Sequence, residues 1–497
     1  MAALSADLER ERSRIEGIAF DYGLTFPRTI FELLDHDELN EVASYGGFPT
    51  RYPHWRFGMD FEELAKGYRW GLQKIYELVI NNDPCYAYLM KSNATVDQKL
   101  VIAHVYGHAD FFQNNLWFAP TNRRMVDQMA NHGIRIRRYM EAVGVEAVED
   151  FLDATLSLDN LIDPYASYPS AARRPAPPEE EPSTRVEVPR LKAKGYMDRY
   201  INPPGFLEGQ RTRLERERAK AKKFPPEPVR DVLQFLIEYA PLERWQADIL
   251  GILREEALYF APQAMTKIMN EGWATYWHSR ILTHHVLGDD EVIDYADHHS
   301  GTVFMAPGRL NPYKIGVELW RDIEERWNRG CFGPEWEACE DAEERRRWDR
   351  ETGQGLPKMF EVRRIYNDVT FLDEFLTPEF VEEHRLFAYR TNPRTGQREI
   401  ADRDPKAVRE AVLRSLTHLG RPWVAIADAN GRNRGELHLH HRHEEIDLEI
   451  EPTLATLKNL HKIWTRPVLL ETQIEGKGKV LSFDGKEAKV EDAGPGG

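Results

Sequence analysis

Apolar positions in the first third of the chain recur every three or four residues, which is the period of an amphipathic helix. The period is clear at 61–80 (FEELAKGYRWGLQKIYELVI) and at 131–156, and weaker in the segments around them. Residues 6–165 are therefore expected to be mostly helical.

The helical period returns after a long polar stretch. It runs from 229 to 289, where Pro262 should bend or break the helix because proline removes a backbone donor and clashes with the preceding turn. A second helix is then expected from about 263 to 287, ending at Gly288, which is typical of a helix end. The pattern continues at 314–329 and fades toward residue 383.

From residue 385 short runs of apolar and β-branched residues replace the helical period, with helical runs at 404–418 and 452–464 between them. The Asn430-Gly431 step indicates a hairpin turn between two of these runs. The five expected strands are LFAYRT, WVAIAD, GELHLHH, PVLLET and GKVLSFD.

These patterns predict a mainly α N-terminal domain over residues 1–383 and a small α+β domain over 384–490. The last residues, 491–497, are expected to be a disordered tail. Residues 167–226 are expected to be a linker or a charged excursion within the first domain, because they begin rich in proline and continue as a strongly charged run.

The net charge of −16 and the pI of about 5.6 argue against general binding to nucleic acid or anionic lipid, because an acidic surface repels phosphate. Three cysteines cannot form a disulfide framework and fit a reduced compartment. No apolar run reaches the ~20 residues of a membrane span, and the charged N-terminus does not resemble a signal peptide. We expect a cytoplasmic protein without membrane insertion or nucleic-acid partners.

His104 and His108 form the first candidate half-site. Thr95-x-x-Gln98 is a capping-box pattern that predicts a helix start, and the two histidines then lie at i and i+4 on an apolar face. This spacing lets two imidazoles reach one zinc ion, although a pair of core histidines has the same pattern. Zinc peptidases carry H-E-x-x-H, whose glutamate acts as general base, whereas this helix has Val105 at that position.

Glu271 forms the second candidate half-site, on a second apolar helix stripe. A buried carboxylate needs a partner, either a metal ion or arginines and tyrosines of a polar core. The segment Asn270-Glu271-Gly272-Trp273-Ala274 resembles the N-E-x-x-A helix that supplies the third zinc ligand in gluzincin peptidases. His278 lies seven residues on, roughly 10.5 Å along the axis, and is better placed as a second-layer or acid/base group.

A catalytic site would still need a general base. Glu255 and Glu256, on the helix before Pro262, are the nearest candidates, and a solvated helix face or a further ligand role explains them equally well. A polar loop between helices is expected around 297–313, lining either the same cleft or the surface. Its candidate residues are His298, His299, Arg309 and Tyr313.

At HVYGHADFF and NEGWATYWH, and again at DHHSG, LNPYKIG and RPVLLET, the sequence resembles the SpoVR family of stage V sporulation protein R-like proteins. The resemblance implies a cytoplasmic protein linked to spore cortex formation or to stress physiology. It also implies two partners, a serine-kinase-like AAA+ protein and a von Willebrand A-type protein. No reaction comes with the resemblance.

Two functional hypotheses follow. The first is a zinc-dependent, or otherwise divalent-metal-dependent, hydrolase of peptide or peptidoglycan-type amides, with His104, His108 and Glu271 as ligands. The second is a non-catalytic scaffold or regulator that works with the two partners, which the loss of the helix's own base at Val105 favours. An iron or manganese oxidase would need carboxylates at E-x-x-H spacing, which the sequence lacks.

Overall fold

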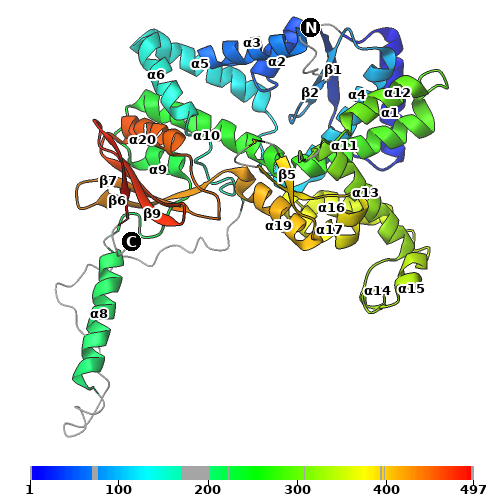
Figure 1. Ribbon diagram of the computed structural model, residues 1–497. Helices are drawn as coiled ribbons and strands as arrows, with labels where there is room; N and C mark the ends of the chain where they lie inside the picture. The colour runs from blue at the N-terminus through cyan, green and yellow to red at the C-terminus, as the bar shows by residue number, and fades with distance from the viewer. Residues whose placement is uncertain are drawn as a thin grey trace. The chain divides into compact units, whose positions relative to one another are not determined.

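The computed structural model describes residues 3–69, 77–168, 202–221, 223–306, 308–391, 395–396 and 398–493, which are mainly helical (Figure 1). These residues form two compact units, each built from two stretches of chain. The first unit contains Met1–Val148 and Leu258–Gly420, and the second contains Glu149–Ala257 and Arg421–Gly497. The expected division at 383 stays a prediction, and the compact units divide the C-terminal region later, after Gly420.

The first unit is built from helices around a small sheet. Two further helices, α6 (Val145–Leu156) and α10 (Arg244–Met265), cross the limits between the units. The longer helices of the first unit are α1 (Ala6–Asp21), α2 (His36–Ser44), α3 (Trp55–Arg69), α4 (Thr95–Asn114), α5 (Met125–Val143), α11 (Lys267–Ile281), α12 (Val292–Thr302), α13 (Pro312–Arg329), α16 (Gly355–Ile365), α17 (Asp368–Phe375), α18 (Pro378–Glu383) and α19 (Pro405–Leu416).

The sheet of the first unit was not expected from the sequence. Its order is β1 (Thr29–Leu34), β3 (Cys85–Met90) and β2 (Glu77–Ile80), with β1 parallel and β2 antiparallel to β3. The expectation of helix through residue 80 is therefore wrong at its end. Strand β2 has only four residues, and its partner β3 comes later in the chain. Its short apolar run therefore continues the helical period before it and resembles the end of a helix.

Helices α4, α11 and α13 form the centre of the first unit. Every residue of α4 from Leu100 to Phe112 is buried, and α11 is buried over most of its length. A helix that is apolar on all sides belongs in the middle of a core. The predicted start of α4 at Thr95 is confirmed, but the capping box is not. The N-cap is Ala94, whose methyl side chain cannot accept a hydrogen bond, and the Gln98 amide donates to the Met90 carbonyl oxygen (2.6 Å).

The break predicted at Pro262 occurs three residues later. Helix α10 continues through Pro262 to Met265, and the Thr266 hydroxyl donates to the Pro262 carbonyl oxygen at 2.7 Å. Helix α11 then begins at Lys267 because the Asp368 carboxylate accepts hydrogen bonds from the backbone N–H groups of Ile268 and Met269. A side chain distant in sequence thus caps the helix, which the local pattern could not indicate.

The end of α11 and the segment after it also differ from the prediction. The α-helix ends at Ile281 and continues as one π-helical turn, Leu282–Val286. The DHHSG segment, expected in a loop, lies within α12. The Asn311 side chain then caps α13.

The second unit contains a five-stranded sheet in the order β10 (Ala488–Asp492), β9 (Lys477–Phe483), β8 (Val468–Ile474), β7 (Glu436–Arg442) and β6 (Trp423–Gly431). All neighbours are antiparallel except β7 and β8, which α20 (Ile450–Trp464) connects. The unit also contains α9 (Val232–Tyr239) and the helix α8 (Pro204–Ala221) of the charged run. Residues 169–201 of the expected linker lie outside the described residues.

Most of the expected C-terminal strands and both helices are confirmed, with three corrections. The hairpin follows Asn430-Gly431 rather than forming there: Arg432 and Asn433 adopt positive φ, and Gly431 is needed because the His438 ring packs where its Cβ would be. Strand β10 includes the first two residues of the expected tail, and residues 494–497 lie outside the described residues. A two-stranded ribbon, β4 (Ala388–Thr391) with β5 (Arg398–Asp402), belongs with α19 to the first unit.

Strand β7, the GELHLHH segment, buries alternate residues over most of its length. Leu437 and Leu439 are buried while His440 is exposed, and His441 is buried with its Nδ1 atom 2.8 Å from the Thr472 hydroxyl. Among the described helices, none is both long and apolar enough to cross a membrane.

Candidate metal centre

His104, His108 and Glu271 bring three ligand atoms to one point in the first unit. The Nε2 atoms of His104 and His108 lie 3.7 and 3.5 Å from the Glu271 Oε2 atom, and the three ligand atoms all lie within 4.8 Å of one another. A tetrahedral zinc ion with bonds of about 2.1 Å holds its ligands roughly 3.4 Å apart. The two histidine–glutamate distances are therefore close to the edge of a zinc coordination tetrahedron.

Close packing of α4 against α11 produces this convergence. The two histidines extend from successive turns of α4, and Glu271 extends from α11. At Gly107, between the histidines, an added Cβ would lie 2.6 Å from the Ala274 Cα atom. The close approach of α4 and α11 therefore requires a glycine at position 107. A second close contact joins α11 to α13, where an added Cβ at Gly272 would lie 2.3 Å from the backbone of Gly316.

Hydrogen bonds behind the rings orient the two histidines. The His108 Nδ1 atom lies 2.9 Å from the Asn270 amide oxygen, which only accepts, so Nδ1 donates and Nε2 keeps its lone pair toward Glu271. Such a partner behind a metal-binding histidine fixes the tautomer that binds metal. Sequence reasoning missed Asn270, although it stands directly before Glu271 in the quoted N-E-x-x-A pattern.

A chain of histidines begins behind His104. Its Nδ1 atom lies 2.8 Å from the His278 Nδ1 atom, and His278 Nε2 lies 3.1 Å from His299 Nδ1 on α12. If His104 donates to His278 and His278 donates to His299, each contact has one donor and one acceptor, and His104 Nε2 keeps its lone pair. His278 thus lies behind a candidate ligand and outside the three-residue cluster.

The electrostatics of the site favour a charged carboxylate at Glu271 and neutral imidazoles at His278 and His299. Burial acts to raise the pKa of Glu271, but the two adjacent histidine rings outweigh burial and hold that pKa well below its ordinary value. Burial, followed by the nearby His104, lowers the pKa of His278 far below its usual range. Burial, followed by the charge of Arg321, lowers the pKa of His299 to about 4. Glu271 is therefore in the anionic form in which a carboxylate binds metal.

The other residues predicted for the site lie in several places. Tyr313 stacks on His104, with ring centroids 6.1 Å apart and planes at 24°. The His298 Nδ1 atom lies 2.7 Å from Asp97 Oδ1, which joins α12 to α4. Arg309 lines a cavity with β4 and α19, and the described lining of that cavity includes none of the three candidate ligands.

Glu255 and Glu256 lie on the part of α10 that belongs to the second unit, whereas the candidate ligands belong to the first. Glu256 is buried and Glu255 is half-buried. Their suggested role as general base stays a prediction.

Val105, at the position of the general base in H-E-x-x-H, is fully buried in the core of the first unit. It packs as a core residue and offers no atom that accepts a proton. The described cluster therefore supplies three ligands, and α4 itself supplies no base.

Comparison with known proteins agrees with the sequence resemblance over residues 3–475. A protein-family model described as SpoVR like protein matches residues 3–421, and one described as SpoVR-like C-terminal domain matches residues 422–475. The first match ends at residue 421, one residue beyond Gly420, where the first compact unit ends.

An uncharacterized protein of Escherichia coli (strain K12), YcgB, is 32% identical over 496 residues, covering 93% of this chain and 91% of the relative. No solved structure matches the chain. The extent of the family match and of this relative shows that the chain belongs to the SpoVR family.

Proposed function

We propose that this SpoVR-family protein binds one divalent metal ion, Zn²⁺ as the first candidate, through His104, His108 and Glu271. The observation that carries the proposal is the convergence of two imidazole nitrogens and one carboxylate oxygen at 3.5–3.7 Å, near the spacing of zinc ligands. Two imidazoles and one carboxylate are also the donor set of catalytic zinc sites, which keep a fourth position for water or substrate.

The more specific proposal is hydrolysis of an amide in a peptide or a peptidoglycan-type substrate. A bound zinc ion supplies a Lewis acid that polarises a carbonyl group. The chain's own part is to fix the ligand tautomers through Asn270 and His278 and to place the Tyr313 ring beside His104. The proton acceptor comes from outside α4, and Glu255 and Glu256 are the carboxylates proposed for it, because both ring nitrogens of His278 already contact His104 and His299.

A second candidate function is a scaffold or regulator in which the same residues hold a structural ion. The observation that favours it is Val105, a buried residue that packs in the core and has no atom that can accept a proton. The metal-binding helix is therefore left without a general base. In this role the protein works with a serine-kinase-like AAA+ protein and a von Willebrand A-type protein in the cytoplasm. Its physiological setting is then spore cortex formation or the response to stress.

Metal content of the purified protein tests the shared part of both functions. Elemental analysis should give about one equivalent of metal per chain, and Glu271→Gln and His104→Ala should each lose it. His441→Ala is the matched control, because it removes a buried histidine from the other unit. Metal binding is refuted if the wild-type protein neither contains nor takes up a stoichiometric ion, or if both site variants retain it.

Activity separates the two functions. The zinc-loaded protein should release amine groups from a peptidoglycan-derived peptide library, and Glu271→Gln should abolish the release. A protein that holds its ion and hydrolyses none of these amides supports the scaffold. A pull-down with the two proposed partners, with wild type and Glu271→Gln, then shows whether the ion is needed for assembly.

A further inference from the structure

A cavity of about 560 Å³ lies in the first unit and is separate in its lining from the candidate metal centre. Its walls are the segment before α13, the residues that lead into β4, the β4–β5 ribbon and one face of α19. The volume falls within the range of small-molecule sites, which is about 300–1,000 Å³. It is too small for a folded partner and suits a ligand of nucleotide size.

Four arginines line this cavity: Arg309, Arg385, Arg390 and Arg398. No aspartate or glutamate is among its described lining residues, although the chain as a whole carries a net charge of −16. Among the described residues, no carboxylate forms an ion pair with any of the four. Four arginines with no acidic side chain among the described lining make the cavity locally positive, which favours an anionic ligand.

The floor of the cavity is apolar. Leu386 and Val408 are buried there, and Val412 is half-buried beside them. Phe387 and Tyr389 add two partly exposed aromatic rings to the wall. An apolar floor with aromatic rings favours a ligand that has a flat or apolar body in addition to its charge.

The arginine-bearing wall is held in place by a backbone contact. Arg398 donates to the carbonyl oxygen of Gly308 and so connects the ribbon to the segment before α13. Gly308 has positive φ, and an added Cβ would lie 3.3 Å from the Tyr389 ring and 2.9 Å from the Arg398 side chain. A glycine is therefore needed where the two walls of the cavity meet.

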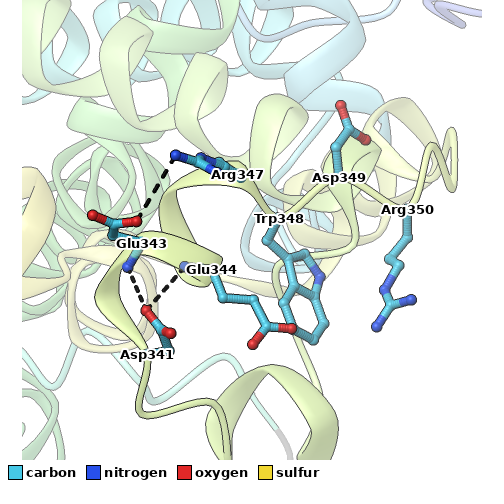
Figure 2. A pocket seen from close by; sticks show the side chains of 7 residues that line it. All are labelled: Asp341, Glu343, Glu344, Arg347, Trp348, Asp349 and Arg350. Carbon is cyan, nitrogen blue, oxygen red and sulfur yellow. Dashed lines mark hydrogen bonds and ion pairs between the residues drawn. The ribbon is translucent and has the colours of Figure 1, made fainter.

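A second cavity of the first unit has a different charge balance. It measures about 450 Å³ and is lined by the seven residues in Figure 2, four of which are acidic. These groups bind one another: Asp341 accepts from the backbone N–H groups of Glu343 and Glu344, and Arg347 lies 3.8 Å from Glu343 (Figure 2). Its polar groups bind one another, whereas three arginines of the first cavity, Arg309, Arg385 and Arg390, form no ion pair with a described carboxylate.

We propose that the first cavity, which we call the arginine pocket, binds an anionic small molecule of the nucleoside diphosphate type. Arginine presents a planar fork of donors that matches the oxygens of phosphate and carboxylate groups. The phosphate groups, or carboxylates of similar charge, contact Arg309, Arg385, Arg390 and Arg398. The flat body lies on Leu386 and Val408, next to the rings of Phe387 and Tyr389.

Isothermal titration calorimetry on the full-length, chelator-treated protein tests the arginine pocket. Treatment with a chelator removes any ion at the candidate metal centre, so that phosphate groups cannot bind there. ADP is the main probe, pyrophosphate carries the charge without the body, and adenosine carries the body without the charge. Citrate distinguishes a preference for carboxylate from one for phosphate. We expect saturable binding of ADP, weaker binding of pyrophosphate and none of adenosine; stronger binding of citrate than of ADP would assign the pocket to polycarboxylates.

Variants locate the binding. Arg309→Gln and Arg390→Gln should each raise the dissociation constant of the anion about ten-fold, since a charge-assisted hydrogen bond contributes that order of affinity. Both side chains are exposed, so folding should be unaffected. Arg364→Gln, an exposed arginine on α16, is the matched control and should leave binding unchanged.

The proposal is overturned if none of the charged probes binds saturably at millimolar concentration, or if both arginine variants bind like wild type. His104→Ala should bind ADP as wild type does. The two proposals are therefore tested independently: the arginine pocket can be refuted without refuting the metal centre, and the metal centre without refuting the arginine pocket.

Discussion

Replacing Gly107 by alanine tests whether the close approach of α4 and α11 creates the metal centre. The added Cβ would lie 2.6 Å from the Ala274 Cα atom and 3.1 Å from its Cβ atom, whereas ordinary contacts are 3.4–4 Å. Because the nearest atom is backbone, the two helices must separate by roughly 1 Å to accommodate a methyl group. Glu271 lies on the opposing helix, so its distance to both histidine nitrogens should increase from 3.5–3.7 Å to roughly 4.5 Å.

Two quantities should change in the Gly107→Ala variant. Overpacking a core of this kind costs about 1–3 kcal/mol, which a gain in helix propensity of about 1 kcal/mol partly offsets. The midpoint of urea unfolding should therefore fall. The dissociation constant for Zn²⁺, measured by competition with a chromogenic chelator, should rise at least ten-fold because the ligands no longer fit one ion.

Gly17→Ala is the matched control, since Gly17 is also a helical glycine but an added Cβ there meets no atom within 4 Å. It should raise stability slightly through helix propensity and leave zinc affinity unchanged. If Gly107→Ala unfolds at the same urea concentration as Gly17→Ala and binds zinc equally well, the reasoning from helix approach is wrong.

Three further predictions concern the surroundings of the metal centre. Asn270→Leu removes the acceptor behind His108, and metal affinity measured by chelator competition should fall about 10–100-fold; unchanged affinity would remove Asn270 from the site. Arg363→Met removes the guanidinium group that lies 2.7 Å from the fully buried Asp110 carboxylate, and it should lower the free energy of unfolding by about 3–5 kcal/mol. The double variant Arg363→Met with Asp110→Asn should recover much of that loss. Burial raises the pKa of Asp368 from 3.8 to about 7, against the pull of its two backbone hydrogen bonds, so the folded protein binds a proton there that the unfolded chain releases above pH 3.8. The free energy of unfolding of metal-free protein should therefore fall by up to about 4 kcal/mol, relative to that of Asp368→Asn, as the pH rises from 4 to 8. If the urea midpoints of the two proteins change by the same amount over this pH range, the prediction is wrong.

The sequence predicted those parts of the candidate site that depend on one helix at a time. His104 and His108 share a face because four residues nearly complete a helical turn, and this holds wherever the helix lies. The pairing with Glu271 followed from the cost of burying a carboxylate, together with the resemblance of its segment to a known ligand helix. The contact of His278 with His104 depends on how two helices cross, and no local pattern carries that information.

The same distinction explains the errors in the fold. Strand β1 pairs with β3 across more than fifty residues, so its apolar positions have no local partner in the sequence. Helix α11 begins where Asp368 caps it from a distance of one hundred residues, whereas the sequence offered only Pro262 as a marker. The arginine pocket was not predicted beyond Arg309, because its four arginines lie on three separate segments that only the tertiary fold brings together.

Helix α11 is fixed at its first turn by the Asp368 carboxylate and on two sides by glycine contacts with α4 and α13. Such a helix has no neighbouring position in which its side chains can repack, so Glu271 is held before any ligand arrives. The conformational entropy of ordering the three ligands is then lost during folding and not during binding. Metal exchange at this centre should consequently resemble exchange at a rigid chelator, in which the ligands hold their positions whether or not the ion is bound.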